Sequence, residues 1–401
     1  MKIEKIEEIL YDNLIKKDKE IVISISGDWG IGKTYFWNDF IKKYESELKD
    51  KKIAYVSLFG QNSLSDIKTS ILLQSSPTKD KVSWLNKKLK GVGDTFKGSQ
   101  KMDEDTSLSF GLGSISSILS ILSSGDFKNV IICIDDFERA SSKIDFKDIL
   151  GLISEFKEQK LCKVVMLFNE EELNKIAAIE DTKQKELFGT YKEKIIDIDC
   201  VFNSTSERSL DIILEKDNIK FTKEQILPVL QRFNIINIRL LRKTILILDT
   251  FSFILDENFN WLVINEFLEI AVSVLVIQNK YSFKQDDYIK IRQIVNGVNT
   301  NTSEKIKLLK DITSEEFKDL DNLFIKFENN GIEEVVFSLI THNVFDKEYL
   351  KKILKERDNQ LSIYKTKKVL PNTWFKLHAD FSYKKTDFQK KKKNIILENK
   401  D

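Results

Sequence analysis

A glycine-rich motif of eight residues constrains this chain more than any other feature. Residues 21–26 have the sequence IVISIS, residues 27–34 have GDWGIGKT, and YFWNDFIKKY follows with the apolar spacing of a helix. The motif fits GxxxxGK[ST] at every fixed position and stands in the required order of strand, tight turn and helix start. Such a turn directs backbone N–H groups and the positive end of a helix at one anion. The sequence therefore predicts a site for a nucleoside triphosphate.

The expected nucleotide-binding residues are the loop and the residue after it. We expect Lys33 to bridge the β- and γ-phosphates and the Thr34 hydroxyl to bind Mg²⁺. The sequence lacks the Asn/Thr-Lys-x-Asp tetrad of guanine-specific proteins, so ATP is favoured over GTP. The full set comprises Gly27, Asp28, Trp29, Gly30, Ile31, Gly32, Lys33, Thr34 and Tyr35.

An apolar run that ends in two acids predicts the metal-holding strand. Residues 130–136 have the sequence VIICIDD. Adjacent carboxylates at the end of a buried strand are costly to desolvate unless a cation is near. We expect Asp135 to hold Mg²⁺ and Asp136 to polarise the attacking water. Asp136 as a mere cap of the following turn is the alternative, and Glu138 in the same turn is the rival base.

Asn169 and Arg239 are the further candidates for contacting the γ-phosphate. Asn169 follows the apolar run 164–168, and a strand between the loop strand and the acidic strand would aim it at the phosphate. Its alternative role is an ordinary N-cap of the next helix. Arg239 lies in NIRLLRK and could reach the phosphate from a lid, or it is simply a surface charge. Arg139 could tie the acidic turn to its neighbours, and Arg208 is a candidate for an arginine supplied to a neighbouring subunit.

The pattern of apolar runs predicts an α/β fold followed by an all-α half. Short, nearly continuous apolar runs separated by helix-length segments are typical of a buried parallel sheet. From about residue 203 the apolar spacing becomes three and four, as in helical bundles. We expect a core at 1–203, a helical lid-like domain at 204–300 and a C-terminal helical domain at 301–401. The strands are expected at 21–26, 53–58, 130–135, 164–168 and 195–200.

The composition disfavours several classes of function and indicates a cytoplasmic protein. Lys+Arg at 64 against Asp+Glu at 63 gives a net charge of +1, so no global field selects nucleic acid or membrane. Three scattered cysteines and two histidines disfavour disulfides, zinc sites and imidazole-based catalysis, and they fit the reducing cytoplasm. The N-terminus is amphipathic and charged rather than a signal peptide.

Three segments could in principle contact a membrane or nucleic acid. The uncharged, serine-rich segment 107–124, from Ser107 to Ser124, is more polar than a membrane span, so we expect a buried strand and helix there. The apolar run 263–277 is interrupted by glutamates and predicts a core helix. The lysine-rich run 384–393, from Lys384 to Lys393, predicts a solvated tail with weak, salt-sensitive nucleic-acid binding at most.

Taken together, several motifs resemble the KAP family of P-loop NTPases. They are GDWGIGKTYFWNDF, YVSLFG, VIICIDDFER, YKEKIIDI and NIRLLRK, which cover roughly residues 10–245. The resemblance implies a core of the additional-strand (ASCE) type with sheet order 5-1-4-3-2 and Mg-ATP binding. It also implies a helical lid with an Asn-x-Arg element, here Asn237 and Arg239, although Ile238 stands where the family usually has Pro. Bacterial members are often linked to phage exclusion, so the resemblance implies a defence role.

Three functions compete at this stage. The leading hypothesis is an ATPase whose hydrolysis drives a switch or an assembly, with the helical half as a surface for self-association or a protein partner. The second is a nucleotide-gated scaffold that binds ATP and barely hydrolyses it alone. The third is a P-loop kinase, which the long helical half disfavours because such enzymes use a short mobile lid.

Overall fold

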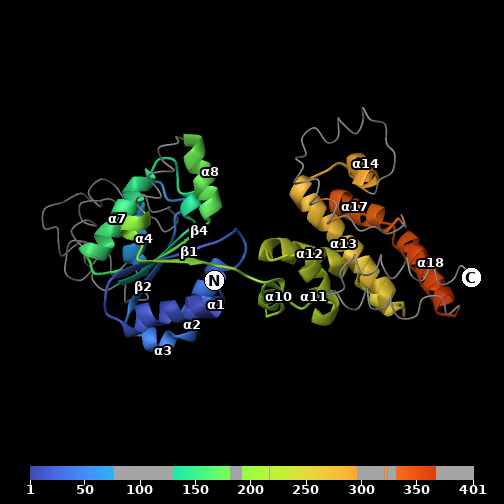
Figure 1. The fold of residues 1–401 in the computed structure, drawn as a ribbon, viewed down its shortest axis with the longest axis horizontal. Helices are drawn as coiled ribbons and strands as arrows, with labels where there is room; N and C mark the ends of the chain where they lie inside the picture. The colour runs from blue at the N-terminus through green and yellow to red at the C-terminus, as the bar shows by residue number, and fades with distance from the viewer. Residues whose placement is uncertain are drawn as a thin grey trace, which may run out of the picture. The chain divides into compact units, whose positions relative to one another are not determined.

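The computed structural model describes residues 1–75, 130–180, 192–215, 217–295, 320, 323 and 331–366. The chain divides into two compact units, Met1–Ser204 and Thr205–Asp401. The first unit is built on a sheet and the second is helical (Figure 1). The segments 107–124 and 384–393 lie outside the described residues, and the further division near residue 300 stays a prediction.

Unit 1 contains a five-stranded sheet in which every neighbouring pair is parallel. Its order is β2-β3-β4-β1-β5, which is the expected 5-1-4-3-2 order seen from the other edge. The strand β4 lies between β1, which carries the loop, and β3, which ends in the acids. The strands are β1 (Ile21–Ser26), β2 (Lys52–Ser57), β3 (Val130–Asp135), β4 (Lys163–Phe168) and β5 (Ile198–Val201).

Burial along the strands follows their places in the sheet. All six residues of β3 and all six of β4 are buried, as the continuous apolar runs predicted for central strands. The outer strands β2 and β5 have alternating or partial burial instead. A strand needs apolar residues on both faces only when both faces are covered, so the sequence pattern marks the centre of the sheet.

The fifth strand begins later than the sequence predicted. Ile195 lies in a short helical segment, and β5 starts at Ile198. Asp197 donates its backbone N–H to the Val22 carbonyl oxygen and accepts the Val22 N–H with its carboxylate at 2.8 Å. Because the side chain replaces a strand carbonyl there, the regular ladder begins only after this residue.

Helices cover both faces of the sheet. Figure 1 shows α1, α2 and α3 on one face and α4 and α7 on the other. Buried side chains of α4 and α7 form one apolar cluster with β2, β3 and β4. In the described part of this unit, the labelled helical elements are α1 (Ile3–Leu10), η1 (Tyr11–Lys16), α2 (Lys33–Lys43), α3 (Glu45–Leu48), α4 (Leu64–Gln74), η2 (Phe137–Arg139), α7 (Phe146–Glu158) and α8 (Glu170–Glu180).

A buried lysine fixes the N-terminal helix to the sheet. Lys163, the first residue of β4, is 6% exposed and donates its ammonium to the carbonyl oxygens of Asn13 at 3.0 Å and Leu14 at 3.2 Å, and also to that of Lys17. Burial lowers the pKa of this lysine. The three carbonyl groups lie at the end of η1, where helical carbonyls lack partners within the helix.

Replacing Lys163 with Met is expected to destabilise unit 1. The change leaves buried carbonyl groups without a donor, at a cost of about 2–3 kcal/mol. The exposed Lys147 on α7 provides the control, because Lys147→Met should change the free energy of unfolding by less than about 0.5 kcal/mol. Urea unfolding followed by circular dichroism measures both variants. Equal midpoints for the two would show that the buried ammonium does not hold the helix.

Unit 2 is helical throughout its described residues, as the sequence predicted. One apolar cluster runs from Leu210 to Leu361 and includes buried side chains from all its long helices. Helix α13 contacts α11, α12, α17 and α18 and is the centre of the unit. The helical elements are α10 (Ser206–Leu214), α11 (Lys223–Arg232), α12 (Ile238–Thr250), η3 (Ser252–Asp256), α13 (Trp261–Tyr281), α14 (Gln285–Val295), α17 (Ile332–His342) and α18 (Lys347–Thr366).

Among the described residues, α13 is long and apolar enough to cross a membrane by length and composition. Its burial inside the unit, at 72% of the apolar window, is that of a core helix. Two buried glutamates on this helix are paired with arginines of neighbouring helices. Glu266 accepts two 2.9 Å hydrogen bonds from Arg357, and Glu269 pairs with Arg232. These pairs explain how a helix this apolar carries two acids, since a buried carboxylate needs a partner.

Candidate functional site

The glycine-rich loop lies between β1 and α2, as the motif predicted. Gly27 continues the pairing of β1, donating its N–H to the Phe168 carbonyl oxygen at 3.1 Å. A Cβ on Gly27 would lie 2.8 Å from the Phe202 carbonyl oxygen, so this position has no room for a side chain. Gly32, with φ of 97°, is the N-cap residue of α2, which begins at Lys33. The loop therefore presents a helix start at the edge where the parallel strands end.

Lys33 is held in the loop by two loop carbonyl groups. Its ammonium donates to the carbonyl oxygens of Gly27 at 2.5 Å and Asp28 at 2.9 Å. The side chain is mostly buried, and burial lowers its pKa, an effect that the charge of Glu138 opposes most strongly. An ammonium has three N–H donors, so these contacts leave one for a phosphate oxygen. A desolvated cation in this position is well suited to bind an anion.

The predicted metal-binding residues lie in direct contact. The Thr34 hydroxyl donates to Asp135 Oδ2 at 2.6 Å, and the Tyr55 hydroxyl donates to the same oxygen at 2.8 Å. The other oxygen accepts the backbone N–H of Asp136 at 2.8 Å. Hard oxygen ligands from one carboxylate and one hydroxyl, completed by phosphate and water, are what Mg²⁺ takes in phosphate sites. Thr34 and Asp135 therefore fit a magnesium ion.

Asp136 is directed toward the outer strand β2. It has left-handed backbone dihedrals, with φ of 58° and ψ of 43°, which Asp and Asn tolerate better than most residues. The Ser57 hydroxyl at the end of β2 donates to its Oδ2 at 2.7 Å, and the Arg139 guanidinium lies 3.8 Å from its Oδ1. Arg139 also stacks over the Phe59 ring, 3.7 Å from its centroid. Since β2 lies across β3 from β4 and β1, this carboxylate is turned away from the loop strand.

Glu138 is the carboxylate that faces the loop. It lies in the short helical turn η2 and is 8% exposed. One oxygen accepts the indole N–H of Trp29 from the loop, and the other accepts the backbone N–H of Asn169 at 3.0 Å. Asn169 directly follows β4, the strand next to β1. The structure thus brings the rival base together with the loop and with the predicted sensor.

Asn169 caps the helix that follows it. Its side-chain oxygen accepts the backbone N–H groups of Glu171 at 3.1 Å and Glu172 at 3.4 Å, both at the start of α8. This is the N-cap arrangement that the sequence left open as the alternative. The same side chain retains amide N–H donors. Its role as a γ-phosphate sensor stays a prediction and rests on those donors.

The predicted arginines of the helical half belong to unit 2. Asn237 caps α12 by accepting the backbone N–H groups of Arg239 at 2.9 Å and Leu240 at 3.1 Å. Arg239 is exposed on the first turn of this helix, and Arg208 lies in the first turn of α10. The Asn-x-Arg element is thereby a helix cap followed by an exposed cation. The phosphate contacts predicted for these arginines stay predictions.

Tyr55 and Ser57 are site residues that the sequence analysis missed. They lie two apart on β2, so their side chains point to the same face of the sheet. The register pairs Ser57 with Asp135, which places both hydroxyl groups beside the acidic pair. Burial, aided by the Asp135 carboxylate, raises the pKa of Tyr55, so the phenol stays a donor. The signal in the sequence was the alternation of polar residues in AYVSL, which a central strand would not have.

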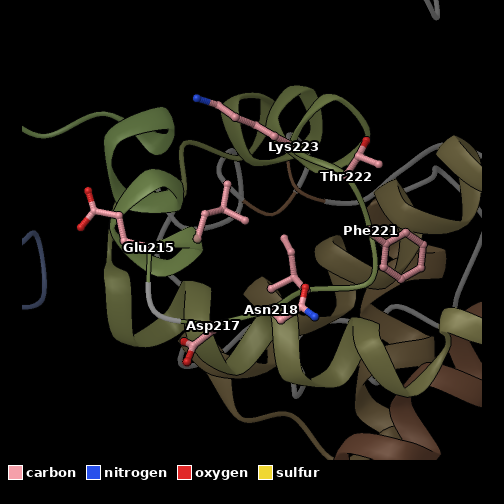
Figure 2. A pocket seen from close by; sticks show the side chains of 8 residues that line it. Glu215, Asp217, Asn218, Phe221, Thr222 and Lys223 are labelled. Carbon is pink, nitrogen blue, oxygen red and sulfur yellow. The ribbon is translucent and has the colours of Figure 1, made fainter.

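Among the described residues, no group of three or more His, Cys, Asp or Glu side chains is arranged to hold a metal by itself. A pocket of about 380 Å³ lies in the helical unit, at the turn between α10 and α11. It is lined by Leu214, Glu215, Asp217, Asn218, Ile219, Phe221, Thr222 and Lys223. Figure 2 shows the charged groups of Glu215, Asp217 and Lys223 directed away from its centre. This pocket therefore lacks inward charges that would select a nucleotide, and the phosphate loop remains the candidate site.

A five-stranded parallel sheet with this order, a phosphate loop after β1 and an acidic end on β3 defines a P-loop NTPase of the additional-strand type. The family model of the KAP family P-loop domain matches residues 3–255. The chain belongs to this family. It is accordingly a nucleotide-binding protein with an ATPase-type core.

Several solved structures match most of the chain at low identity and low TM-score. The ORC2 protein of Aeropyrum pernix is 14% identical with a TM-score of 0.41, covering 88% of this chain and 85% of that one. Cdc6p of Pyrobaculum aerophilum is 15% identical with a TM-score of 0.42, covering 89% and 85%. A Walker-type ATPase of Pyrococcus abyssi is 15% identical with a TM-score of 0.38, covering 80% and 88%. No curated protein matches the chain. Likenesses this distant carry no functional argument.

Proposed function

We propose that this protein hydrolyses ATP in a Mg²⁺-dependent reaction at the phosphate loop, with Glu138 orienting the attacking water. The observation that carries the proposal is the position of the Glu138 carboxylate, which contacts the loop through Trp29 and the end of β4 through Asn169. The neighbouring Asp136 is turned toward β2. Glu138 therefore takes the role of base that the sequence had assigned to Asp136.

The reaction follows from the side chains of the site. Lys33 would donate its remaining N–H to the triphosphate where the β- and γ-phosphates meet, and Thr34 and Asp135 would hold Mg²⁺. The ion, when bound, neutralises charge that develops on the phosphates. Glu138 accepts a hydrogen bond from water, whose oxygen attacks the γ-phosphorus as the bond to the β-phosphate oxygen breaks. The proton passes to Glu138, and the products are ADP and inorganic phosphate. An amide N–H of Asn169 stabilises the γ-phosphate oxygens.

Hydrolysis is proposed to drive a switch or an assembly. The sheet unit and the helical unit are separate compact bodies within one chain, which is the arrangement needed for a nucleotide-driven motion. Self-association or a protein partner would use the helical unit. We also propose that this activity takes place in the cytoplasm, an expectation that rests on the three scattered cysteines of the sequence.

The family resemblance motivates a role in anti-phage defence. In a phage-sensitive bacterium that expresses the chain, the wild type is expected to lower the plating efficiency of a susceptible phage. Lys33→Ala should restore plating, because it removes nucleotide binding. Equal plating with both forms against a broad phage panel would contradict the defence role and leave the ATPase proposal standing.

Product analysis with γ-labelled ATP tests the enzymatic proposal. Free phosphate as the labelled product, formed only with Mg²⁺, supports hydrolysis. Label on an acceptor molecule would instead indicate a kinase. ATP binding without any phosphate release, alone or at high protein concentration, would indicate the nucleotide-gated scaffold.

A further inference from the structure

The geometry points to Trp29 as a positioning residue: its indole N–H fixes the Glu138 carboxylate, so that the phosphate loop itself aligns the water-orienting group. This inference rests on the proposed ATPase function. It assigns to Trp29 a role beyond its expected place in the nucleotide-binding loop.

Glu138 is held at both of its carboxylate oxygens. The Trp29 Nε1 group donates to Oε1, and the Asn169 backbone N–H donates to Oε2 at 3.0 Å. The two donors lie in the segments that follow adjacent strands, since Trp29 is in the loop after β1 and Asn169 directly follows β4. Each carboxylate oxygen has two lone pairs, so both oxygens can still accept from water. A group held from two sides keeps its direction while the remaining lone pairs do chemistry.

Trp29 is not placed for packing. It is 44% exposed, whereas Trp37 on the adjacent helix is 1% exposed. Although the side chain is exposed, its indole N–H donates to the carboxylate of the mostly buried Glu138 rather than to water alone. The residue lies among the glycines that shape the loop, between Gly27 and Gly32. Its position therefore depends on the conformation of the same backbone that binds the phosphates.

The arrangement links two events that hydrolysis requires together. The Trp29 hydrogen bond connects the loop backbone, which would surround a bound triphosphate, to Glu138, 109 residues away in sequence. Removing the N–H while keeping the aromatic ring should leave nucleotide binding intact. This change should make the position of the Glu138 carboxylate less well defined. It should therefore lower the rate of hydrolysis and leave the affinity for nucleotide unchanged.

The test is Trp29→Phe, with the exposed Trp261→Phe in the helical unit as matched control. We expect Trp29→Phe to lower kcat for ATP hydrolysis about tenfold, as for loss of one hydrogen bond to a charged group. KM and the Kd of ADP should change by less than about twofold. In a Glu138→Gln background the same substitution should have no further effect on kcat, because the carboxylate that Trp29 positions is already absent. Trp261→Phe should leave all three constants unchanged.

The outcomes separate this inference from the function on which it rests. If Glu138→Gln abolishes turnover while Trp29→Phe retains the wild-type kcat, only the positioning role is overturned. The same holds if the two substitutions multiply independently in the double variant. A wild-type protein that binds ATP and releases no phosphate would overturn both proposals. Thermal unfolding of each variant confirms that kcat is compared between folded proteins.

Discussion

Replacing Glu138 with Gln is expected to slow ATP hydrolysis by about 100-fold or more, as for loss of a general base. The amide has the shape of the carboxylate and retains an oxygen that can accept one of the two N–H groups, from Trp29 or Asn169. It cannot take a proton from water. Nucleotide affinity should stay close to the wild-type value, since neither Lys33 nor Thr34 is touched. Phosphate release and equilibrium binding of ATP measure the two effects separately.

Asp136→Asn is the matched control for this prediction. It lies two residues away on the same turn and retains an oxygen that can accept from the Ser57 hydroxyl. We expect it to change turnover by less than about threefold. The opposite pattern, with Asp136→Asn inactive and Glu138→Gln active, would return the role of base to Asp136. It would also contradict the direction in which the structure points these two carboxylates.

Lys33→Ala is expected to weaken ATP binding by about 100-fold or more, as for loss of charge-assisted hydrogen bonds to phosphate. Turnover is lost with it. The free energy of unfolding should not fall, because the folded protein carries the cost of a desolvated cation, which lowers the pKa of Lys33. Unlike the carbonyl groups at Lys163, those of Gly27 and Asp28 belong to loop residues that are half-buried or exposed, so water can replace the ammonium. Titration with fluorescent ATP and thermal unfolding without nucleotide measure the two quantities.

The exposed Lys42 at the other end of α2 provides the control for Lys33. Lys42→Ala removes the same charge from the same helix, so a general electrostatic effect would appear in both variants. We expect wild-type ATP affinity for it. Similar losses in the two variants would mean that net charge, rather than the contacts of Lys33 within the loop, governs binding.

The sheet and its loop could be predicted from sequence because local patterns determine them. The continuous apolar runs of β3 and β4 identified buried central strands, and the motif at 27–34 fixed the position of the loop. The position of β4 between β1 and β3 could be predicted because ATPase cores of the additional-strand type have a strand between the loop strand and the acidic strand. The start of β5 was wrong by three residues, because the Asp197 side chain replaces a backbone partner and leaves no trace in an apolar pattern.

The direction of side chains within the acidic turn was beyond sequence reasoning. Asp136 and Glu138 are both acids in DDFER, and either could act as base. The left-handed conformation of Asp136 turns the chain there and directs Glu138 toward β4 and Trp29. A single backbone conformation therefore decides which carboxylate faces the loop. Tyr55 was missed for a similar reason, since its contact with Asp135 depends on the register between β2 and β3.

The central claim is that Lys33, Thr34 and Asp135 hold one Mg²⁺–triphosphate complex in the loop. Its most direct test is the binding of ATPγS, a slowly hydrolysed analogue, with and without Mg²⁺, to the wild type and to Asp135→Asn. We predict that Mg²⁺ tightens binding by about tenfold or more in the wild type and by less than about twofold in the variant. An equal effect of Mg²⁺ on both proteins would contradict the claim that Asp135 shares the ion with the loop.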